Sequence, residues 1–107
     1  MSTDHELLEL AAKAAGISVE WSDEVAEYQT DYGIGFLEPW NPLADDGDCA
    51  RLCATLGIGT EWAERRVICV CDGYYNYTVF ADHNGDKSSA WRKAAVKVAA
   101  NFGRAMP

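Results

Sequence analysis

The stretch PWNPLADDGDCARL, from Pro39 to Leu52, decides how this chain folds. Three aspartates surround Gly47, an Asn-Pro pair precedes them, and an apolar run follows. An EF-hand calcium loop needs glycine at its sixth position and glutamate at its twelfth, but counting from Asp45 the glycine is third and the twelfth residue is Leu56. A phosphate-binding loop does not fit either, because the GxxxxGK motif is missing and three carboxylates would repel the ligand.

The stretch instead predicts the start of a helix. Asp45 or Asp46 can accept hydrogen bonds from the unpaired amides of the first turn, and Asp48 complements the positive end of the helix dipole. We therefore expect a helix that ends before Gly57 and whose acids face outward. Its apolar face comprises Cys49, Leu52, Cys53 and Leu56.

Two further helices flank this one. Thr3-Asp4-His5-Glu6 has the pattern of a capping box and begins a helix that Gly16 ends. Asp86 or Ser88 begins a C-terminal helix that Gly103 ends.

Strands are predicted between the helices. Residues 17–22 alternate apolar with polar side chains, and a second, less regular strand signal lies in residues 25–32 or 35–37. Pro39 and Pro42 should then end any pairing, because proline has no amide hydrogen to donate.

A hairpin is predicted after the second helix. Residues 66–71 should pair with residues 75–81 across the Asp72-Gly73 turn. All residues of the first strand from Val67 to Cys71 are apolar, on both of its faces. We therefore expect the strand to be covered on both faces.

The resulting order is α-β-β-α-β-β-α. A chain of 107 residues with this order predicts one domain, residues 1–107, of the α+β class. The simplest packing is an antiparallel sheet layered between helices, an α-β-α sandwich.

The charge of the chain is −8 and is unevenly distributed. Residues 1–48 carry 12 Asp and Glu against one Lys, and residues 49–107 carry 5 acids against 8 Lys and Arg. Such a chain should repel phosphate backbones, which disfavours direct nucleic-acid binding. The basic positions of the C-terminal helix can form a solvated face or pair with the acidic half, within one chain or between two: Lys87, Arg92, Lys93 and Lys97.

The sequence also indicates a compartment. No apolar run is long enough to span a membrane, and the N-terminus has acids where a secretory signal has Lys or Arg. We expect a cytoplasmic protein whose thiols stay reduced.

Four cysteines form the most suggestive constellation: Cys49, Cys53, Cys69 and Cys71. Four thiolates can bind zinc tetrahedrally, but the C-x3-C and C-x-C spacings lie inside regular apolar elements rather than in CxxC knuckles. Buried thiols are the preferred interpretation, with a metal site and a disulfide or redox role as alternatives.

The sequence lacks an evident catalytic constellation. His5 lies in the first turn of a helix, and His83 lies in a polar turn where Asp82 and Asp86 could hold an ion weakly. The GxSxG, HExxH and GxGxxG motifs do not occur. We therefore expect a non-enzymatic protein without a cofactor.

The chain resembles a known family in three segments: WNPLADDGDCARLCATLGI, HELLELAAKAAGI before it, and AWRKAAVKVAANFGRAM after it. These are similar to the phage ABA sandwich domain family of small bacteriophage proteins, most strongly in NPLADDGDxxRL, whereas residues 59–86 match only in outline. The resemblance implies an α-β-α layered fold and a phage or prophage origin, but no activity and no catalytic residues. The motif does not require Cys49 or Cys53, so a thiol function would be particular to this protein.

The charge asymmetry favours a protein that binds a host or phage protein with a basic surface, including a host defence or nucleic-acid-binding protein that it would inhibit in the host cytoplasm. The alternatives are a structural or assembly role as a self-associating protein, for example a homodimer, and a metal-binding module built on the four cysteines. Candidate partner-binding residues are four acids and three aromatic residues expected near the surface: Asp23, Glu24, Glu27, Asp31, Trp40, Tyr74 and Tyr75.

Overall fold

The computed structural model describes residues 3–31, 36–71, 77–82 and 85–107 of the chain. Three helices alternate with two groups of strands. In chain order the elements are α1 (Asp4–Ala15), β1 (Glu20–Ser22), β2 (Glu27–Thr30), β3 (Glu38–Pro39), α2 (Asp46–Leu56), β4 (Ile58–Trp62), β5 (Arg66–Cys71), β6 (Tyr77–Asp82) and α3 (Lys87–Ala105).

The strands form two antiparallel three-stranded sheets. The N-terminal sheet has the order β1-β2-β3, and the C-terminal sheet has the order β4-β5-β6. The predicted α+β class, with antiparallel strands packed against helices, is confirmed. Two additional strands, β3 and β4, extend the predicted order to α-β-β-β-α-β-β-β-α.

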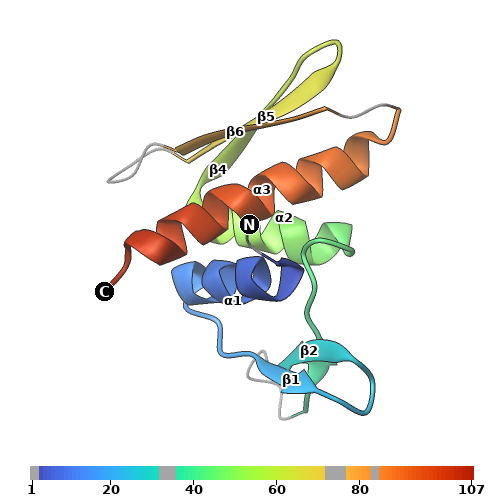
Figure 1. Ribbon diagram of the computed structural model, residues 1–107, viewed down its shortest axis with the longest axis vertical. Coiled ribbons are helices and arrows are strands. Elements are labelled where there is room, and N and C mark those ends of the chain that lie inside the picture. The colour runs from blue at the N-terminus through green and yellow to red at the C-terminus, as the bar shows by residue number, and fades with distance from the viewer. Residues whose placement is uncertain (1–2, 32–35, 72–76, 83–84) are drawn as a thin grey trace.

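The layers are arranged with the helices between the sheets (Figure 1). Helix α3 runs along one face of the C-terminal sheet and packs against α1 on its other side. The N-terminal sheet lies beyond α1, at the opposite end of the longest axis from the C-terminal sheet. The molecule therefore has two sheets at its two ends instead of one sheet between helices.

The ends of α1 and α2 follow the sequence signals. Thr3 Oγ1 accepts a hydrogen bond from the amide of Glu6 at 3.1 Å, and Asp45 caps α2 in the same way. Gly16 and Gly57 both adopt the left-handed conformation with φ of 71°, which a residue with a Cβ rarely adopts. Both predicted helices are confirmed.

The C-terminal helix differs from its prediction at Gly103. Asp86 caps α3 as expected, but the helix continues through Gly103 to Ala105. A Cβ at position 103 would lie 2.1 Å from the carbonyl oxygen of Leu10 in α1. This glycine is needed for the close contact of two helices and does not end one.

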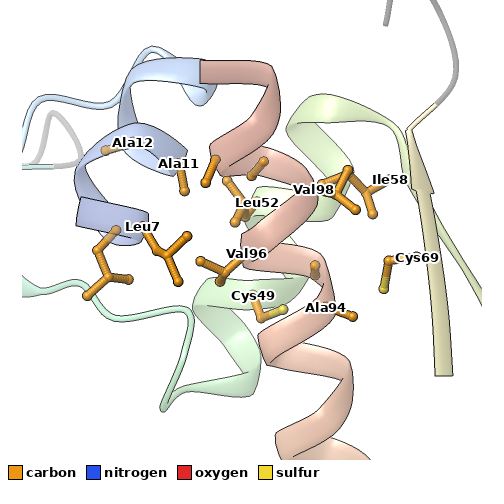
Figure 2. Packing of buried hydrophobic residues seen from close by; sticks show 14 of the residues in the cluster. Leu7, Ala11, Ala12, Cys49, Leu52, Ile58, Cys69, Ala94, Val96 and Val98 are labelled. Atoms are coloured by element: carbon orange, nitrogen blue, oxygen red, sulfur yellow. The ribbon is translucent and has the colours of Figure 1, made fainter. Parts of the chain in front are cut away.

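Small side chains dominate the core between the helices (Figure 2). Ala11 and Ala12 of α1 and Ala94 of α3 are buried, and Leu52 and Val96 fill the remaining space between α1, α2 and α3. Alanine allows the backbones to approach closely, so the core depends on helix contact more than on large side chains.

Trp40 belongs to this core, contrary to its predicted position near the surface. It was predicted at the surface, but only 1% of it is exposed. Its amide donates to the carbonyl of Tyr28 at 2.9 Å, which directs the side chain inward at the end of the N-terminal sheet. The neighbouring Pro39 pairs with Gln29 in β3, so proline does not end the pairing; β3 is an edge strand, where proline is tolerated.

The burial of the two faces of β5 also differs from the prediction. Val67 and Cys69 are buried beneath α3, whereas Ile68 and Val70 on the opposite face are only half-buried. The strand is thus covered fully on one face. Among the described residues, no helix is both long and apolar enough to cross a membrane.

Candidate functional site

The aspartate-rich turn is an internal structural network. Asp45 Oδ2 accepts from the amide of Asp48 at 2.9 Å, which confirms the predicted helix start. The side chain of Asp48 is turned inward, with 4% of the residue exposed, and accepts from the amide of Asn41 at 2.9 Å. Arg51 donates to the other oxygen of Asp48. The expectation that all acids of this turn face outward is therefore wrong for Asp48.

The same network reaches α3. Asn41 Oδ1 accepts from the amide of Leu43, and Arg92 donates to the carbonyl of Leu43 at 2.9 Å. Arg92 also forms an ion pair with Asp46, so one basic residue of α3 does pair with the acidic half of the same chain. These contacts join the turn to α3 within the same chain. No group of three or more His, Cys, Asp or Glu side chains within the described ranges is placed to hold a metal ion.

Acids are concentrated on the N-terminal sheet and the turns beside it. We define the acidic lobe as residues 20–31 and 36–39, which contain six acids and no Lys or Arg among their described positions: Glu20, Asp23, Glu24, Glu27, Asp31 and Glu38. Indeed, the sequence has no Lys or Arg between Lys13 and Arg51. Asp23 and Glu24 are exposed in the turn between β1 and β2, Asp31 is exposed after β2, and Glu27 is half-buried.

Exposed apolar side chains gather on the same lobe. Of the five large hydrophobic residues exposed in the described part of the chain, four belong to the acidic lobe and the fifth is Trp62 of β4. Phe36 is the most open, with 63% exposed. Large apolar side chains beside charged ones are typical of surfaces that contact other proteins. The four lobe residues are Trp21, Val25, Phe36 and Leu37.

An aromatic cluster joins the lobe to α1. The Trp21 ring lies 4.3 Å from the His5 ring and 5.1 Å from the Tyr28 ring, centroid to centroid. Trp21 Nε1 donates to Asp23 at 2.9 Å, and the Tyr28 hydroxyl donates to Glu9 at 2.6 Å. Burial and the bond to Glu9 raise the pKa of Tyr28 to about 12. The cluster fixes the orientation of a tryptophan that remains 40% exposed.

Two hollows lie between the lobe and the N-termini of the helices. One, of about 310 Å³, is bordered by α1, Trp21 and Leu43; the other, of about 480 Å³, is bordered by Glu38, Asp45 and Arg51. Glu27, Asn41 and Ala44 line both, so the hollows adjoin one another. A third hollow, of about 530 Å³, lies between α1 and Arg104 near the end of α3.

Basic side chains occupy another part of the molecule. Lys93 and Lys97 are exposed one turn apart on α3, and Arg104 is exposed two turns further on. Within the described residues, no carboxylate lies within ion-pair distance of Lys93 or Lys97. The protein is therefore electrostatically polar, with an acidic lobe and a basic stripe on α3.

Three of the cysteines belong to the core or pack against it: Cys49, Cys53 and Cys69. Cys49 and Cys69 are buried free thiols, as preferred from the sequence, and Cys53 is a half-buried free thiol. Hydrogen bonding to Cys53, together with burial, raises the pKa of Cys49, and the bond from Cys49 lowers the pKa of Cys53. Burial raises the pKa of Cys69 to about 11. We therefore expect Cys53, which is also the least buried, to be the most reactive of these three thiols.

The structure brings some of the predicted partner-binding residues together. Asp23, Glu24, Glu27 and Asp31 lie on the acidic lobe, and Trp40 lies in the core. Tyr74, Tyr75 and His83 lie outside the described residues, as does the side chain of Cys71.

Trp21 was not among the predicted surface residues; it lies in residues 17–22, where apolar and polar side chains alternate. Strand β1 begins only at Glu20, so the alternation extends beyond the strand. An Asp two residues after the tryptophan was the available signal, since its carboxylate can hold the indole N–H near the surface.

Comparisons with protein families, with curated proteins and with solved structures find no match for this chain.

Proposed function

We propose that this chain is a non-enzymatic accessory protein of phage or prophage origin that binds a basic partner protein through its acidic lobe. One observation carries the proposal. The lobe combines six acids, no Lys or Arg at its described positions, and four of the five exposed large apolar side chains of the described residues. Acids alone would make a solvated face, but acids beside exposed apolar groups are suited to a charged partner surface.

The electrostatics favour a basic partner. At α2, Asp45 and Asp48 pair with Arg51, and Asp46 pairs with Arg92. Glu20 and Glu24 are exposed and form no ion pair with a described residue, so their field extends into solvent. A groove of another protein that normally accepts nucleic acid has the complementary charge. Inhibition of a host defence or nucleic-acid-binding protein in the host cytoplasm is the biological role that we propose for this surface.

The phage origin depends on the resemblance in NPLADDGDxxRL. Its polar residues Asn41, Asp45, Asp48 and Arg51 bond to one another at the start of α2. This is consistent with a motif that maintains a fold, and it leaves the function to the surrounding surface.

Self-association is the second candidate, and the basic stripe on α3 favours it. Lys93 and Lys97 of one copy could face the acidic lobe of another, which would give a head-to-tail contact. Sedimentation at low and high salt distinguishes the two functions. A monomer at about 50 µM and low salt supports the binding protein, whereas salt-sensitive oligomers support self-association.

A pair of charge-reversal variants tests the proposed function. Glu20→Lys with Glu24→Lys alters the lobe, and Glu61→Lys with Glu64→Lys makes the same change in net charge near β4, where both acids are exposed. Each tagged protein is used to capture proteins from a bacterial lysate at about 50 and 500 mM salt, where the Debye length falls from about 14 Å to about 4 Å. We expect the wild type and the β4 variant to retain basic proteins at low salt only, and the lobe variant to lose them. Identical capture by both variants, or capture indifferent to salt, would contradict the proposal.

A further inference from the structure

Strand β4 forms an open edge of the C-terminal sheet. It pairs with β5 on one side, and no described strand lies on its other side. Every residue from Gly59 to Trp62 is exposed. Edge strands are usually protected by short length, proline or lysine. In the N-terminal sheet, β1 and β3 have only three and two residues and β3 contains Pro39, whereas β4 has five residues and neither Pro nor Lys.

The free backbone groups of β4 belong to alternate residues. The amide of Ala63 donates to the carbonyl of Arg66 at 2.9 Å, so Ala63 directs its backbone groups toward β5. This direction alternates along an antiparallel strand. Ile58, Thr60 and Trp62 therefore direct their N–H and C=O groups away from β5, toward any strand that lies next to the edge.

Helix α3 leaves this side of the sheet largely uncovered. It packs along β5 and β6 and reaches β4 at Trp91, whose Nε1 donates to Thr60 at 3.0 Å. Trp62 is opposite the buried Val67 in the strand register, so both side chains lie on the face that α3 covers. Trp62 is nevertheless 53% exposed. The hairpin of β4 and β5 extends beyond α3, which leaves room beside this tryptophan (Figure 1).

A second copy of the chain has a strand that complements this edge. With a two-fold axis perpendicular to the sheet, one residue of β4 lies opposite itself. An axis at Glu61 would place two carboxylates directly opposite each other, which is destabilising. An axis at Gly59 would leave Trp62 without a strand residue opposite it. An axis at Thr60 pairs all five residues, with Ile58 opposite Trp62 and Gly59 opposite Glu61 of the second copy.

We propose that two copies of this chain pair antiparallel through β4, with Thr60 opposite Thr60, and form a continuous six-stranded sheet. Ile58, Thr60 and Trp62 exchange backbone hydrogen bonds with the same three residues of the second copy. The two α3 helices lie on one face of this sheet, separated by the two β4 strands. Trp62 and Trp91 of both copies fill the space between the helices.

The contact is small and contains no ion pair. Two five-residue strands and their tryptophans belong at the low end of specific interfaces, below about 1,200 Å², where association is transient. We expect a Kd of about 0.3 mM, which gives mainly monomer at about 50 µM and mainly dimer at about 1 mM. Each copy has a charge of −8, so added salt should not weaken this dimer, unlike the head-to-tail contact.

Position 59 tests the register of the dimer. A Cβ at Gly59 would have the carbonyl oxygen of Val70 as its nearest atom, at 3.9 Å, so the position accepts a side chain. In the proposed dimer, Gly59→Lys places a lysine opposite Glu61 at two symmetry-related positions, and Gly59→Glu places a glutamate there. Ala50 is exposed on α2, and Ala50→Lys and Ala50→Glu are controls with the same changes in net charge.

Sedimentation equilibrium between about 20 µM and 1 mM protein measures the dimer. We expect Gly59→Lys to dimerise about tenfold more tightly than Gly59→Glu, and the two Ala50 variants to differ by less than about twofold. Trp62→Leu should weaken the dimer about fivefold, because an exposed tryptophan at the contact is lost. Trp21→Leu, in the acidic lobe, should leave it unchanged.

Three results would each overturn the inference. The first is a wild type that is monomeric at 1 mM, even if β4 then accepted a strand of another protein. The second is a dimer that responds alike to Gly59→Lys and Gly59→Glu, which would place the contact at another edge. The third is a dimer that dissociates at about 500 mM salt, as the head-to-tail contact would.

The β4 dimer goes beyond the proposed function, and the two can fail separately. Glu20→Lys with Glu24→Lys alters only the acidic lobe, so this variant should dimerise like the wild type. Loss of capture by that variant supports the lobe and leaves β4 untouched. A monomeric wild type that still captures basic proteins would end the dimer and keep the proposed function.

Discussion

The position of Gly103 shows how one residue sets the distance between two layers. The atom that a Cβ would meet at 2.1 Å belongs to the backbone of α1 at Leu10, which cannot rotate away as a side chain can. The close approach of α1 and α3 thus depends on the absence of a side chain at this position.

Gly103→Ala should therefore separate the two helices. We expect a loss of about 2 kcal/mol or more in the free energy of unfolding, measured by urea denaturation, because overpacked cores lose about 1 to 3 kcal/mol. Gly47→Ala in α2 is the matched control, since its nearest neighbours are side-chain atoms of Asp45 and Arg51. The control should change stability by less than about 1 kcal/mol. Similar losses in both variants would contradict the proposed role of Gly103.

The cysteines differ in reactivity because their surroundings differ. Cys53 is half-buried and its pKa is lowered by the bond from Cys49, whereas burial protects Cys49 and Cys69. In the native protein at pH 8, iodoacetamide should modify Cys53 before Cys49 and Cys69, as mass spectrometry of the digested protein can measure. In urea these three thiols should react at similar rates. Earlier modification of Cys49 or Cys69 in the native protein would be inconsistent with this packing.

At the scale of the elements, Asp48 holds α2 to the loop that precedes it. Asp48 connects the helix to the preceding loop at Asn41 and is buried while it does so. Removing the carboxylate leaves the amide of Asn41 and the guanidinium group of Arg51 without this acceptor.

Asp48→Ala should cost about 2 to 4 kcal/mol of unfolding free energy, because a buried hydrogen-bonded charge is lost. The control is Glu24→Ala, an exposed acid in the turn between β1 and β2, which should cost less than about 0.5 kcal/mol. Thermal or urea unfolding of both variants provides the measurement. A loss at Asp48 no larger than that at Glu24 would show that the network does not stabilise α2.

The contact between the N-terminal sheet and α1 depends on pH through Tyr28. Its pKa is about 12 in the folded protein and about 10 when unfolded, so the folded state holds the phenolic proton more tightly. This contribution to stability is fully present below pH 10 and is lost as the pH rises through 12. The pKa of Cys69 is about 11 in the folded protein and about 9 when unfolded, so this thiol adds a second loss of stability that begins near pH 9.

Tyr28→Phe should remove the part of this pH dependence that arises from Tyr28. The variant should be less stable than the wild type between pH 7 and 9, where the bond to Glu9 is intact, and the difference should shrink between pH 10 and 12. Urea unfolding at each pH measures it. A difference that stays constant up to pH 12 would mean that Tyr28 does not hold its proton more tightly in the folded state.

At the scale of the whole molecule, local signals predicted the helices well and the layers less well. Caps at Thr3, Asp45 and Asp86 act over three or four residues, so they can be read directly from the sequence. The strands before α2 form one sheet and the strands after it form another. Neither alternation nor turn residues tell whether strands on the two sides of a helix pair with each other.

The candidate site was predicted only in its charge. Asp23 and Glu24 were expected at a surface and lie there, because acids in a turn are solvated wherever the strands pack. Trp40 was expected near the surface but is only 1% exposed, whereas Trp21, which was not a surface candidate, is 40% exposed. Aromatic side chains suit a core or a surface equally well, so tertiary contacts such as the Trp40 amide to the Tyr28 carbonyl decide between them.

The central claim is that the acidic lobe contacts a basic partner. The most direct measurement is an NMR titration of the ¹⁵N-labelled protein with a basic protein recovered in the capture experiment. We predict that the amides of residues 20–31 and 36–39, together with the indole N–H of Trp21, shift at low salt and return toward their free positions at about 500 mM salt. Shifts that concentrate in β4 to β6 or on the basic stripe of α3, with the lobe unchanged, would contradict the claim.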